Sequence, residues 1–320
     1  MLRDPYIHEL KEFSDLIQIV STEKGIIPQL VEKDYWIMHC LYGLTDQDFK
    51  FELKGGTSLS KGFNVIKRFS EDIDIRFEPP TSDVLGFEVF TGKNHTKKPH
   101  HIESRKNFYD WLAKNISIDG IVNVERDHAF DDDVYRSGGI RLNYESQFES
   151  LSGLKEGILL EIGFDDTTPN ENVIMSSWAY DKAVSSVTIL DNRAQDIKCY
   201  NPGYTFVEKL QAISTKFRQQ QELGTLPTNF LRHYYDVSQL LHHPIVQEFI
   251  STEDYHARKS VRFRTDDNLN IAENEAFLLN DKDTRDLYTT EFNKTADLYY
   301  DGQPTFDEII SNIHHHIDKL

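Results

Sequence analysis

Glu52-Leu-Lys-Gly-Gly-Thr-Ser-Leu-Ser-Lys61 and, further along, Phe69-Ser-Glu-Asp-Ile-Asp-Ile75 carry the clearest structural pattern in this chain. The short extended run at 51–54 predicts a strand, and the two glycines after it break that strand. Residues 58–67 then place apolar side chains at helical spacing. Residues 70–77 alternate between apolar and charged side chains, which predicts a second strand. The predicted order is strand, glycine turn, helix and strand.

The glycine turn and the second strand suit a phosphate and a metal ion. Gly55 and Gly56 allow a tight turn, and the N–H groups that open the next helix, with the Ser58 hydroxyl, form an anion-binding end. Asp72 and Asp74 project from one face of their strand, and paired carboxylates suit Mg²⁺, with Mn²⁺ as an alternative. Each feature alone is most often a plain turn or a solvated face. Because the short helix returns the strand to the turn, we predict one site.

Glu161 is the only charge in Gly157-Ile-Leu-Leu-Glu-Ile-Gly-Phe164, a stretch that is otherwise typical of a buried strand. An unpaired carboxylate there would cost free energy. Two interpretations stay open. Glu161 is a third ligand, as a two-metal displacement at phosphorus would need, or it is a core residue paired with Arg141 on a neighbouring strand.

Charged residues elsewhere give weaker signals. Lys61 follows the glycine turn, but the next residue is Gly62 rather than Ser or Thr, so this is not a P-loop. Lys209 lies beside the apolar stripe of a predicted helix, from which a long cation could reach a triphosphate. Arg232 and Asp236 are spaced i, i+4, which by itself favours a surface ion pair.

The composition excludes several classes of protein. The chain has 320 residues, 38% hydrophobic and 28% charged, which supports one large or two ordinary domains and excludes disordered and fibrous proteins. Its net charge of −18 is opposite in sign to that of a protein that holds duplex nucleic acid through its overall charge. Any nucleic-acid contact must therefore be local, and the one strongly basic window is 93–106.

Cys40 and Cys199 make neither a disulfide framework nor a zinc site, which fits a reducing compartment. The N-terminus lacks the apolar core of a signal peptide, and nowhere do 18 apolar residues run together. We therefore expect a soluble, cytoplasmic protein without a membrane partner.

The rest of the pattern predicts an α+β fold. Helices are expected at 5–24, 28–43 and 107–115, and further strands at 138–144, 157–164 and 186–190. After Asn201-Pro202-Gly203 the pattern becomes helical, as at 206–217 and 230–241. We predict a first domain over 1–200, a mixed sheet with flanking helices, and a helical C-terminal domain over 201–320.

Gly-Gly-Thr-Ser, followed after thirteen residues by Asp-Ile-Asp, resembles the signature of the DNA polymerase β-like nucleotidyltransferase superfamily. Four longer motifs extend the likeness: RFSEDIDI (68–75), GILLEIGF (157–164), TFVEKLQAISTKFR (205–218) and RHYYDVSQLL (232–241). With them the chain resembles the AbiEii/AbiGii family of nucleotidyltransferase toxins. The motifs cover most of the chain and come in the family's order.

The resemblance implies a role for each matching residue. Asp236 matches the acidic residue of the last motif, which the family treats as part of the active site, with a base toward the acceptor as one open role. Glu161 matches the third strand position, at which toxins of this group vary. The predicted catalytic residues are Asp72, Asp74, Glu161 and Asp236, the first two as metal ligands. The predicted nucleotide-binding residues are Gly55, Gly56, Thr57, Ser58, Lys61, Lys209 and Arg232.

The resemblance also implies a reaction and partners. It implies Mg²⁺-dependent transfer of an NMP from an NTP to an acceptor, which in studied relatives is the acceptor end of tRNA, as the toxin of a type IV-like toxin–antitoxin or phage-defence system with a cognate antitoxin. Transfer to a protein hydroxyl and a non-catalytic nucleotide-binding module stay open as alternatives. The basic residues expected to grip tRNA are Lys97, Lys98, Arg105, Lys106, Arg258, Lys259, Arg262 and Arg264.

Overall fold

A computed structural model of the chain describes residues 3–94, 96–149 and 154–320. It divides into two compact units. The first comprises Met1–Gly62 and Phe69–Tyr200, and the second comprises Phe63–Arg68 and Asn201–Leu320. The short segment between the glycine turn and the predicted aspartate strand therefore belongs to the second unit.

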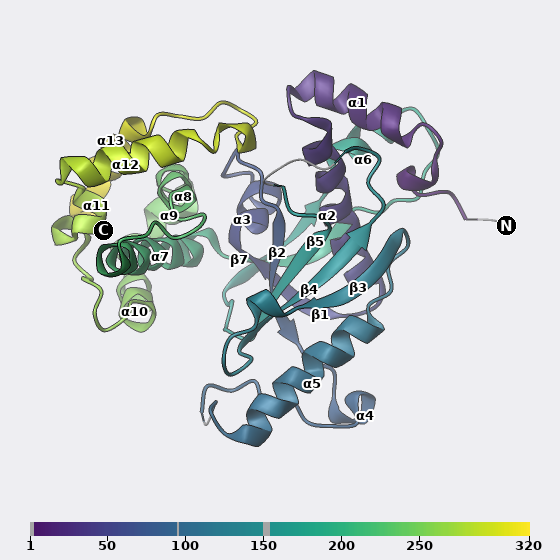
Figure 1. The fold of residues 1–320 in the computed structure, drawn as a ribbon, viewed down its shortest axis with the longest axis horizontal. Helices are drawn as coiled ribbons and strands as arrows, with labels where there is room; N and C mark the ends of the chain where they lie inside the picture. The colour runs from purple at the N-terminus through teal and green to yellow at the C-terminus, as the bar shows by residue number, and fades with distance from the viewer. Residues whose placement is uncertain (1–2, 95, 150–153) are drawn as a thin grey trace. The chain divides into compact units, whose positions relative to one another are not determined.

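A mixed sheet of seven strands, counted over the described residues, forms the centre of the first unit, in the order β3-β4-β5-β2-β1-β7-β6 (Figure 1). The strands are β1 (Lys50–Lys54), β2 (Asp72–Glu78), β3 (Ile121–Asp127), β4 (Ser137–Tyr144), β5 (Ile158–Gly163), β6 (Asn170–Met175) and β7 (Ala194–Tyr200). β1 pairs antiparallel with β2 and parallel with β7, whereas β2 pairs parallel with β5. This mixed sheet with helices around it confirms the predicted α+β fold.

One face of the sheet is apolar and covered by helices. The helical elements of the first unit are a short turn at Ile7–Glu9, α1 (Phe13–Lys24), α2 (Pro28–Asp46), α3 (Gly55–Thr57), a π-helical turn at Ser58–Gly62, α4 (Ser82–Leu85), α5 (Pro99–Asn115), a turn at His128–Phe130 and α6 (Trp178–Ala183). Phe77 of β2 packs on Phe108 of α5, with ring centroids 5.6 Å apart, and Trp36 of α2 stacks on Tyr144 of β4 at 4.8 Å. The strand registers place Phe77 and Tyr144 on the same face. The alternating residues of β2, including Asp72, therefore point to the opposite face.

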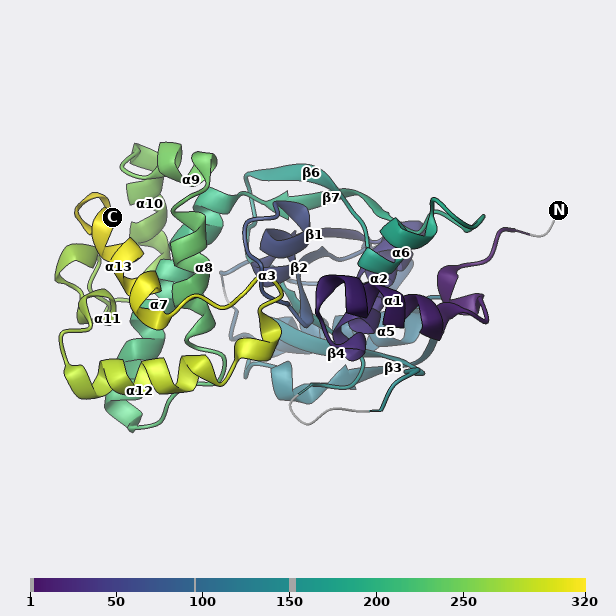
Figure 2. The same cartoon turned by 90° about the horizontal axis from the view of Figure 1, so that it is seen from above.

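The second unit is helical in its described residues. Its elements are α7 (Pro202–Leu223), α8 (Arg232–Leu240), α9 (Pro244–Phe249), α10 (Glu253–Arg262), a turn at Ile271–Glu273, α11 (Glu275–Leu278), α12 (Lys282–Asn293), a turn at Ala296–Leu298, α13 (Phe306–His316) and a turn at Ile317–Lys319. Figure 2 shows α7 and α8 running in a common direction and α12 crossing that direction. The side chain of Asn201 caps α7, and Gly224 ends it in the left-handed conformation. No helix in the described part of the chain is long and apolar enough to span a membrane.

Several elements differ from the sequence prediction. The helix predicted at 58–67 ends at Gly62, whose Cα lies against Cys199 of β7, and residues 63–68 leave the first unit. The strand predicted at 186–190 is wrong, since these residues form a turn and coil after α6. β3, β6 and β7 were not predicted. β3 and β6 are edge strands of the sheet, so they carry polar residues and lack a clear alternating pattern. β7 lies between β1 and β6, but the burial of its residues does not alternate either.

Candidate functional site

The glycine turn brings the backbone against a carboxylate. Gly55 has φ +72°, a left-handed conformation that favours glycine. A Cβ atom at this position would lie 2.1 Å from Oδ2 of Asp74. Gly55 is therefore required twice, by its backbone conformation and by the closeness of Asp74. The predicted return of the strand to the turn is present.

Three charged residues stand in register on adjacent strands beside this turn. Lys54 of β1 pairs with Asp74 of β2, which pairs with Glu161 of β5, so all three side chains project to one face of the sheet. Asp72 lies two residues before Asp74 and shares that face. We call Asp72, Asp74 and Glu161 the acidic site.

The acidic site is electrostatically strained. The pKa of Glu161 is raised to about 7, first by the negative charge of Asp74 and then by burial, while Lys54 opposes the shift. The charge of Asp72 adds to the increase. The carboxylates of the acidic site therefore repel one another at a partly buried position of the sheet.

A divalent cation fits this arrangement by charge and by donor type. Carboxylate oxygens are hard ligands, and a cation between them would relieve the repulsion that raises the pKa of Glu161. Over the described ranges, no group of three or more His, Cys, Asp or Glu side chains is arranged to hold a metal ion as the side chains stand. Asp72, Asp74 and Glu161 are the candidate residues for such an ion because their carboxylates share one face of the sheet.

The core-pair alternative for Glu161 is not what the structure has. Arg141 of β4 instead donates to Oδ2 of Asp127 at 3.0 Å and to the carbonyl of Glu156 at 2.8 Å. The groups that act on Glu161 are Asp74, which both repels it and shares a hydrogen bond with it, Asp72, and the ammonium of Lys54. Glu161 is therefore part of the acidic site and not of an ion pair with Arg141.

Lys155 and Thr57 also border the acidic site, and neither contact was predicted. The ammonium of Lys155 lies 3.8 Å from Oδ2 of Asp72. The hydroxyl of Thr57 donates to the main-chain carbonyl of Asp72 at 2.7 Å, which ties the helix after the glycine turn to the start of β2. No pattern in the sequence had pointed to Lys155.

Other predicted turn residues are engaged inside the first unit. Gly56 and Ser58 are buried, and the Ser58 hydroxyl lies beside the thiol of Cys199, whose pKa burial raises to about 12. Lys61 forms an ion pair with Asp34 at 2.8 Å. Its ammonium also lies 4.6 Å from the centre of the Trp178 ring.

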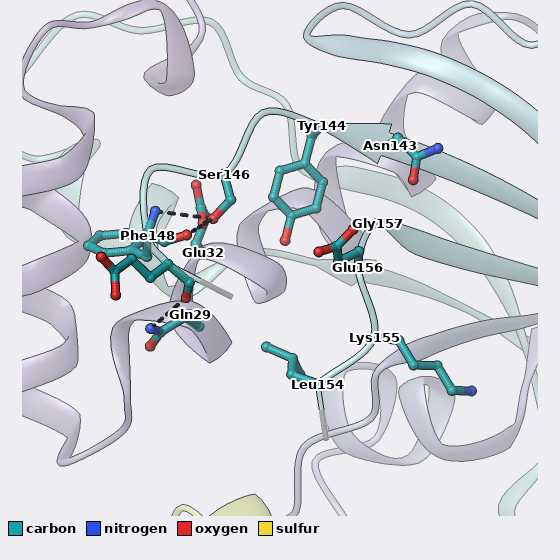
Figure 3. A pocket seen from close by; sticks show the side chains of 11 residues that line it. Gln29, Glu32, Asn143, Tyr144, Ser146, Phe148, Leu154, Lys155, Glu156 and Gly157 are labelled. Carbon is teal, nitrogen blue, oxygen red and sulfur yellow. Dashed lines mark hydrogen bonds between the residues drawn. The ribbon is translucent and has the colours of Figure 1, made fainter. Parts of the chain in front are cut away.

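A cavity of about 400 Å³ opens beside Lys155 (Figure 3). Figure 3 shows Glu32 and Ser146 at one side of this cavity and Lys155 at another. Its described lining residues are Gln29, Glu32, Asn143, Tyr144, Ser146, Phe148, Glu149, Leu154, Lys155, Glu156 and Gly157. Lys155 thus faces both this cavity and Asp72.

The second unit holds a different group of charges, which we call the ion cluster: Asp236, Arg68 and Lys209. Nε and Nη2 of Arg68 each donate to Asp236 at 2.7 Å, and Nζ of Lys209 lies 3.1 Å from Oδ2. Asp236 has no exposed surface. The surface ion pair that the i, i+4 spacing favours by itself is not what the structure has, because α8 turns Asp236 inward; the role that the resemblance implies for Asp236 stays a prediction.

The ion cluster is neutralised internally. Burial opposes ionisation of Asp236, but the charges of Arg68 and Lys209 outweigh it, and the pKa of Asp236 lies well below its ordinary value. Burial lowers the pKa of Lys209, an effect that Asp236 offsets in part. Arg232 lines a cavity of about 300 Å³ in the same unit, together with Arg68.

Arg68 is a member of the ion cluster to which sequence reasoning assigned no role. It belongs to the motif RFSEDIDI, four residues before Asp72, but carried no assigned role. The structure pairs the backbone of Arg68 with Tyr299 and its side chain with Asp236. Its position in the motif was the only available signal.

Part of the basic surface expected to grip tRNA is occupied. Arg105 is buried and donates to the carbonyls of Phe90, Thr96 and Val134. Lys259 is buried and donates to the carbonyl of Leu320. Arg258 and Arg262 pair with Glu208, at 2.8 and 3.5 Å. The exposed members of the set are Lys97, Lys98, Lys106 and Arg264.

Comparison with protein families gives one match across most of the chain. Residues 39–312 match the family model described as "Nucleotidyl transferase AbiEii toxin, Type IV TA system". No curated protein matches the chain. The matched range includes the glycine turn, the whole acidic site and the ion cluster.

Proposed function

We propose, from the premise that the chain belongs to the AbiEii nucleotidyltransferase toxin family, that the acidic site binds Mg²⁺ and that the enzyme transfers an NMP from an NTP to a hydroxyl at the acceptor end of tRNA. Membership in the family makes the chain a nucleotidyltransferase and implies a type IV toxin–antitoxin system with an antitoxin partner. The crowding of Asp74 and Glu161, which raises the pKa of Glu161 to about 7, is the observation that carries the metal assignment.

The residues of the first unit would orient the substrate. Gly55 lets the backbone turn directly against Asp74, and the N–H groups that follow it open a helix toward a phosphate. Asp72, Asp74 and Glu161 would hold the metal, which when bound supplies charge stabilisation for the α-phosphate and the leaving pyrophosphate. Lys155 offers a further cation beside Asp72. The bond from the acceptor oxygen to the α-phosphorus forms as the bond to pyrophosphate breaks.

We assign Asp236 a positioning role rather than that of a base. Both of its oxygens accept from Arg68 or Lys209, and its pKa is well below its ordinary value. A group with such a low proton affinity is a weak general base at neutral pH. Asp236 would instead fix the two cations Arg68 and Lys209 inside the second unit.

One labelling experiment distinguishes transfer to tRNA from transfer to a protein. The wild-type chain is incubated with Mg²⁺ and each α-labelled NTP in turn, together with total tRNA or with a cell lysate. We expect label that survives protease and is lost with nuclease. Label that survives nuclease and is lost with protease would replace tRNA by a protein acceptor, a result that the net charge of −18 would help explain.

The acidic site is tested with Asp72→Asn. Loss of a metal ligand removes several kcal/mol of transition-state stabilisation, so label transfer should fall about 10³-fold while thermal unfolding is unchanged. Asp196→Asn, at an exposed position on β7, is the matched control and should retain wild-type transfer. Undiminished transfer by Asp72→Asn would refute the site.

A further inference from the structure

Three consecutive charged residues on α2 are buried. Glu32, Lys33 and Asp34 expose 1%, 1% and 3% of their surface. Charged side chains are almost never buried this completely unless they are paired. The three residues precede the range 39–312 that matches the family model. Each reaches a different segment of the first unit.

Lys33 ties together the two segments that border Asp72. Its ammonium donates to the carbonyl of Lys155 at 2.6 Å and to Oε2 of Glu71 at 3.3 Å. The main-chain N–H of Lys155 donates to the same oxygen of Glu71. Glu71 immediately precedes Asp72, and the ammonium of Lys155 lies 3.8 Å from Asp72. Lys33 therefore fixes both the start of β2, which carries Asp72, and Lys155, the cation beside Asp72.

Asp34 holds the helix that follows the glycine turn. One oxygen pairs with the ammonium of Lys61 at 2.8 Å, and the other accepts from the main-chain N–H of Trp178 at 2.8 Å. Lys61 belongs to the π-helical turn that continues α3. Because the pair is buried, it restrains the glycine turn relative to α2.

Glu32 serves a segment away from these two. Its carboxylate accepts from the Ser146 hydroxyl at 2.6 Å and from the main-chain N–H of Gln147 at 2.9 Å. In Figure 3 Glu32 and Ser146 lie together, apart from Lys155. Glu32 has the same burial and the same helix as its two neighbours, which makes it a matched control.

We propose that Lys33 and Asp34 are positioning residues with separate tasks: Lys33 sets the metal affinity of the acidic site, and Asp34 sets the affinity of the glycine turn for the NTP. This inference rests on the proposed function for the identity of the ligands. The division of tasks follows from the contacts, since Lys33 acts on the segments next to Asp72 and Asp34 acts through Lys61.

The experiment measures metal and nucleotide binding separately from activity. Full-length chain stripped with EDTA is titrated with Mn²⁺, and free Mn²⁺ is followed by electron paramagnetic resonance. Binding of a non-hydrolysable NTP analogue at saturating Mn²⁺ is followed by calorimetry. Lys33→Met should weaken Mn²⁺ binding about tenfold, the size typical of lost support around metal ligands, and leave analogue binding at saturating Mn²⁺ within twofold. Asp34→Asn should weaken analogue binding about tenfold and leave Mn²⁺ binding within twofold.

Glu32→Gln should change neither affinity, although it should lower the unfolding temperature. Should Lys33→Met fail to fold, Lys33→Arg keeps the charge, shifts the contacts and should weaken Mn²⁺ binding in the same direction. Lys61→Met removes the ion-pair partner of Asp34 and should weaken analogue binding as Asp34→Asn does. Wild-type Mn²⁺ affinity in a folded Lys33 variant, or equal losses of both affinities in all three positions, would overturn the inference. Absence of label transfer by the wild type would instead count against the proposed function alone, because the Mn²⁺ titration still reports on Lys33.

Discussion

The acidic site of the first unit and the ion cluster of the second unit solve opposite electrostatic problems. In the acidic site, Asp74 raises the pKa of Glu161 to about 7, because two carboxylates stand side by side on neighbouring strands. In the ion cluster, Arg68 and Lys209 hold the pKa of Asp236 well below its ordinary value against the effect of burial. One group of carboxylates is repelled by its neighbours, and the other is satisfied by them.

The two places differ in what a bound cation would change. Lys54 offsets the repulsion within the acidic site only in part, since the pKa of Glu161 stays raised, so an added cation would stabilise these carboxylates further. The ion cluster gains nothing from an added ion, since both oxygens of Asp236 already accept from buried cations. Removing a carboxylate charge should therefore raise the free energy of unfolding in the acidic site and lower it in the ion cluster.

The largest effect is expected for Asp236→Asn, because it leaves Arg68 and Lys209 buried without their counter-charge. Breaking a buried ion pair by removing one partner costs about 3–5 kcal/mol, which urea unfolding would measure. Glu222→Gln, which removes the exposed partner of Arg218 in the same unit, is the control and should cost less.

The pH dependence of this effect has a definite sign. The pKa of Asp236 is lowered in the folded state, so its stabilisation is present above the ordinary pKa of 3.8 and is lost as the pH falls further toward the folded-state pKa. The difference in free energy of unfolding between wild type and Asp236→Asn should narrow only in that acidic range. A gap that is small at pH 7 would show that the ion cluster is not a scaffold.

Gly55→Ala should have the next largest effect, on activity. The new methyl group would meet Asp74 at the position where a Cβ falls 2.1 Å from Oδ2, and misplacing a reacting group by about 1 Å costs about 10²-fold in rate. Gly86→Ala is the control, since Gly86 has φ +78° but no atom within 4 Å of the added Cβ. Both variants should lose about 1 kcal/mol of stability from the left-handed backbone, and only Gly55→Ala should lose label transfer. Equal transfer by the two variants would separate Asp74 from the reaction.

The smallest effect is expected for Glu161→Gln, and its sign distinguishes the acidic site from the ion cluster. The folded-state pKa of about 7 exceeds the ordinary value of 4.5, so the folded protein loses stability as the pH rises from 4.5 through 7. Without metal, Glu161→Gln should therefore be more stable than wild type at pH 8, by on the order of 1 kcal/mol, and equal to it near pH 4.

Thermal unfolding in EDTA at the two pH values measures this difference. Glu125→Gln, on the exposed edge strand β3, is the control for the loss of a carboxylate away from the acidic site. Added Mg²⁺ should stabilise the wild type more than Glu161→Gln. Lower stability of Glu161→Gln at pH 8 would mean that Glu161 has a favourable partner and does not await a cation.

Strands with a strong local pattern were predictable, whereas β3, β6 and β7, which lack one, were not. β2 and β5 lie in the middle of the sheet, so their apolar residues are buried and their charges are conspicuous. β3 and β6 form its edges, where solvent tolerates polar residues and the alternation fades. The helix after the glycine turn was overextended, because its apolar residues beyond Gly62 serve the second unit instead.

By itself the sequence determined the strand, glycine turn and aspartate strand, because φ-permissive glycines and a two-residue alternation are local properties. It also showed which carboxylates share a face. Only the tertiary structure determined which charges are neutralised, since that depends on contacts between residues far apart in sequence. Asp236 looked like a surface residue and is held by Arg68, and Glu161 had Arg141 as a possible partner and has Asp74 beside it instead. Long-range pairing, which no local pattern encodes, decides whether a carboxylate is neutralised by cations or repelled by its neighbours.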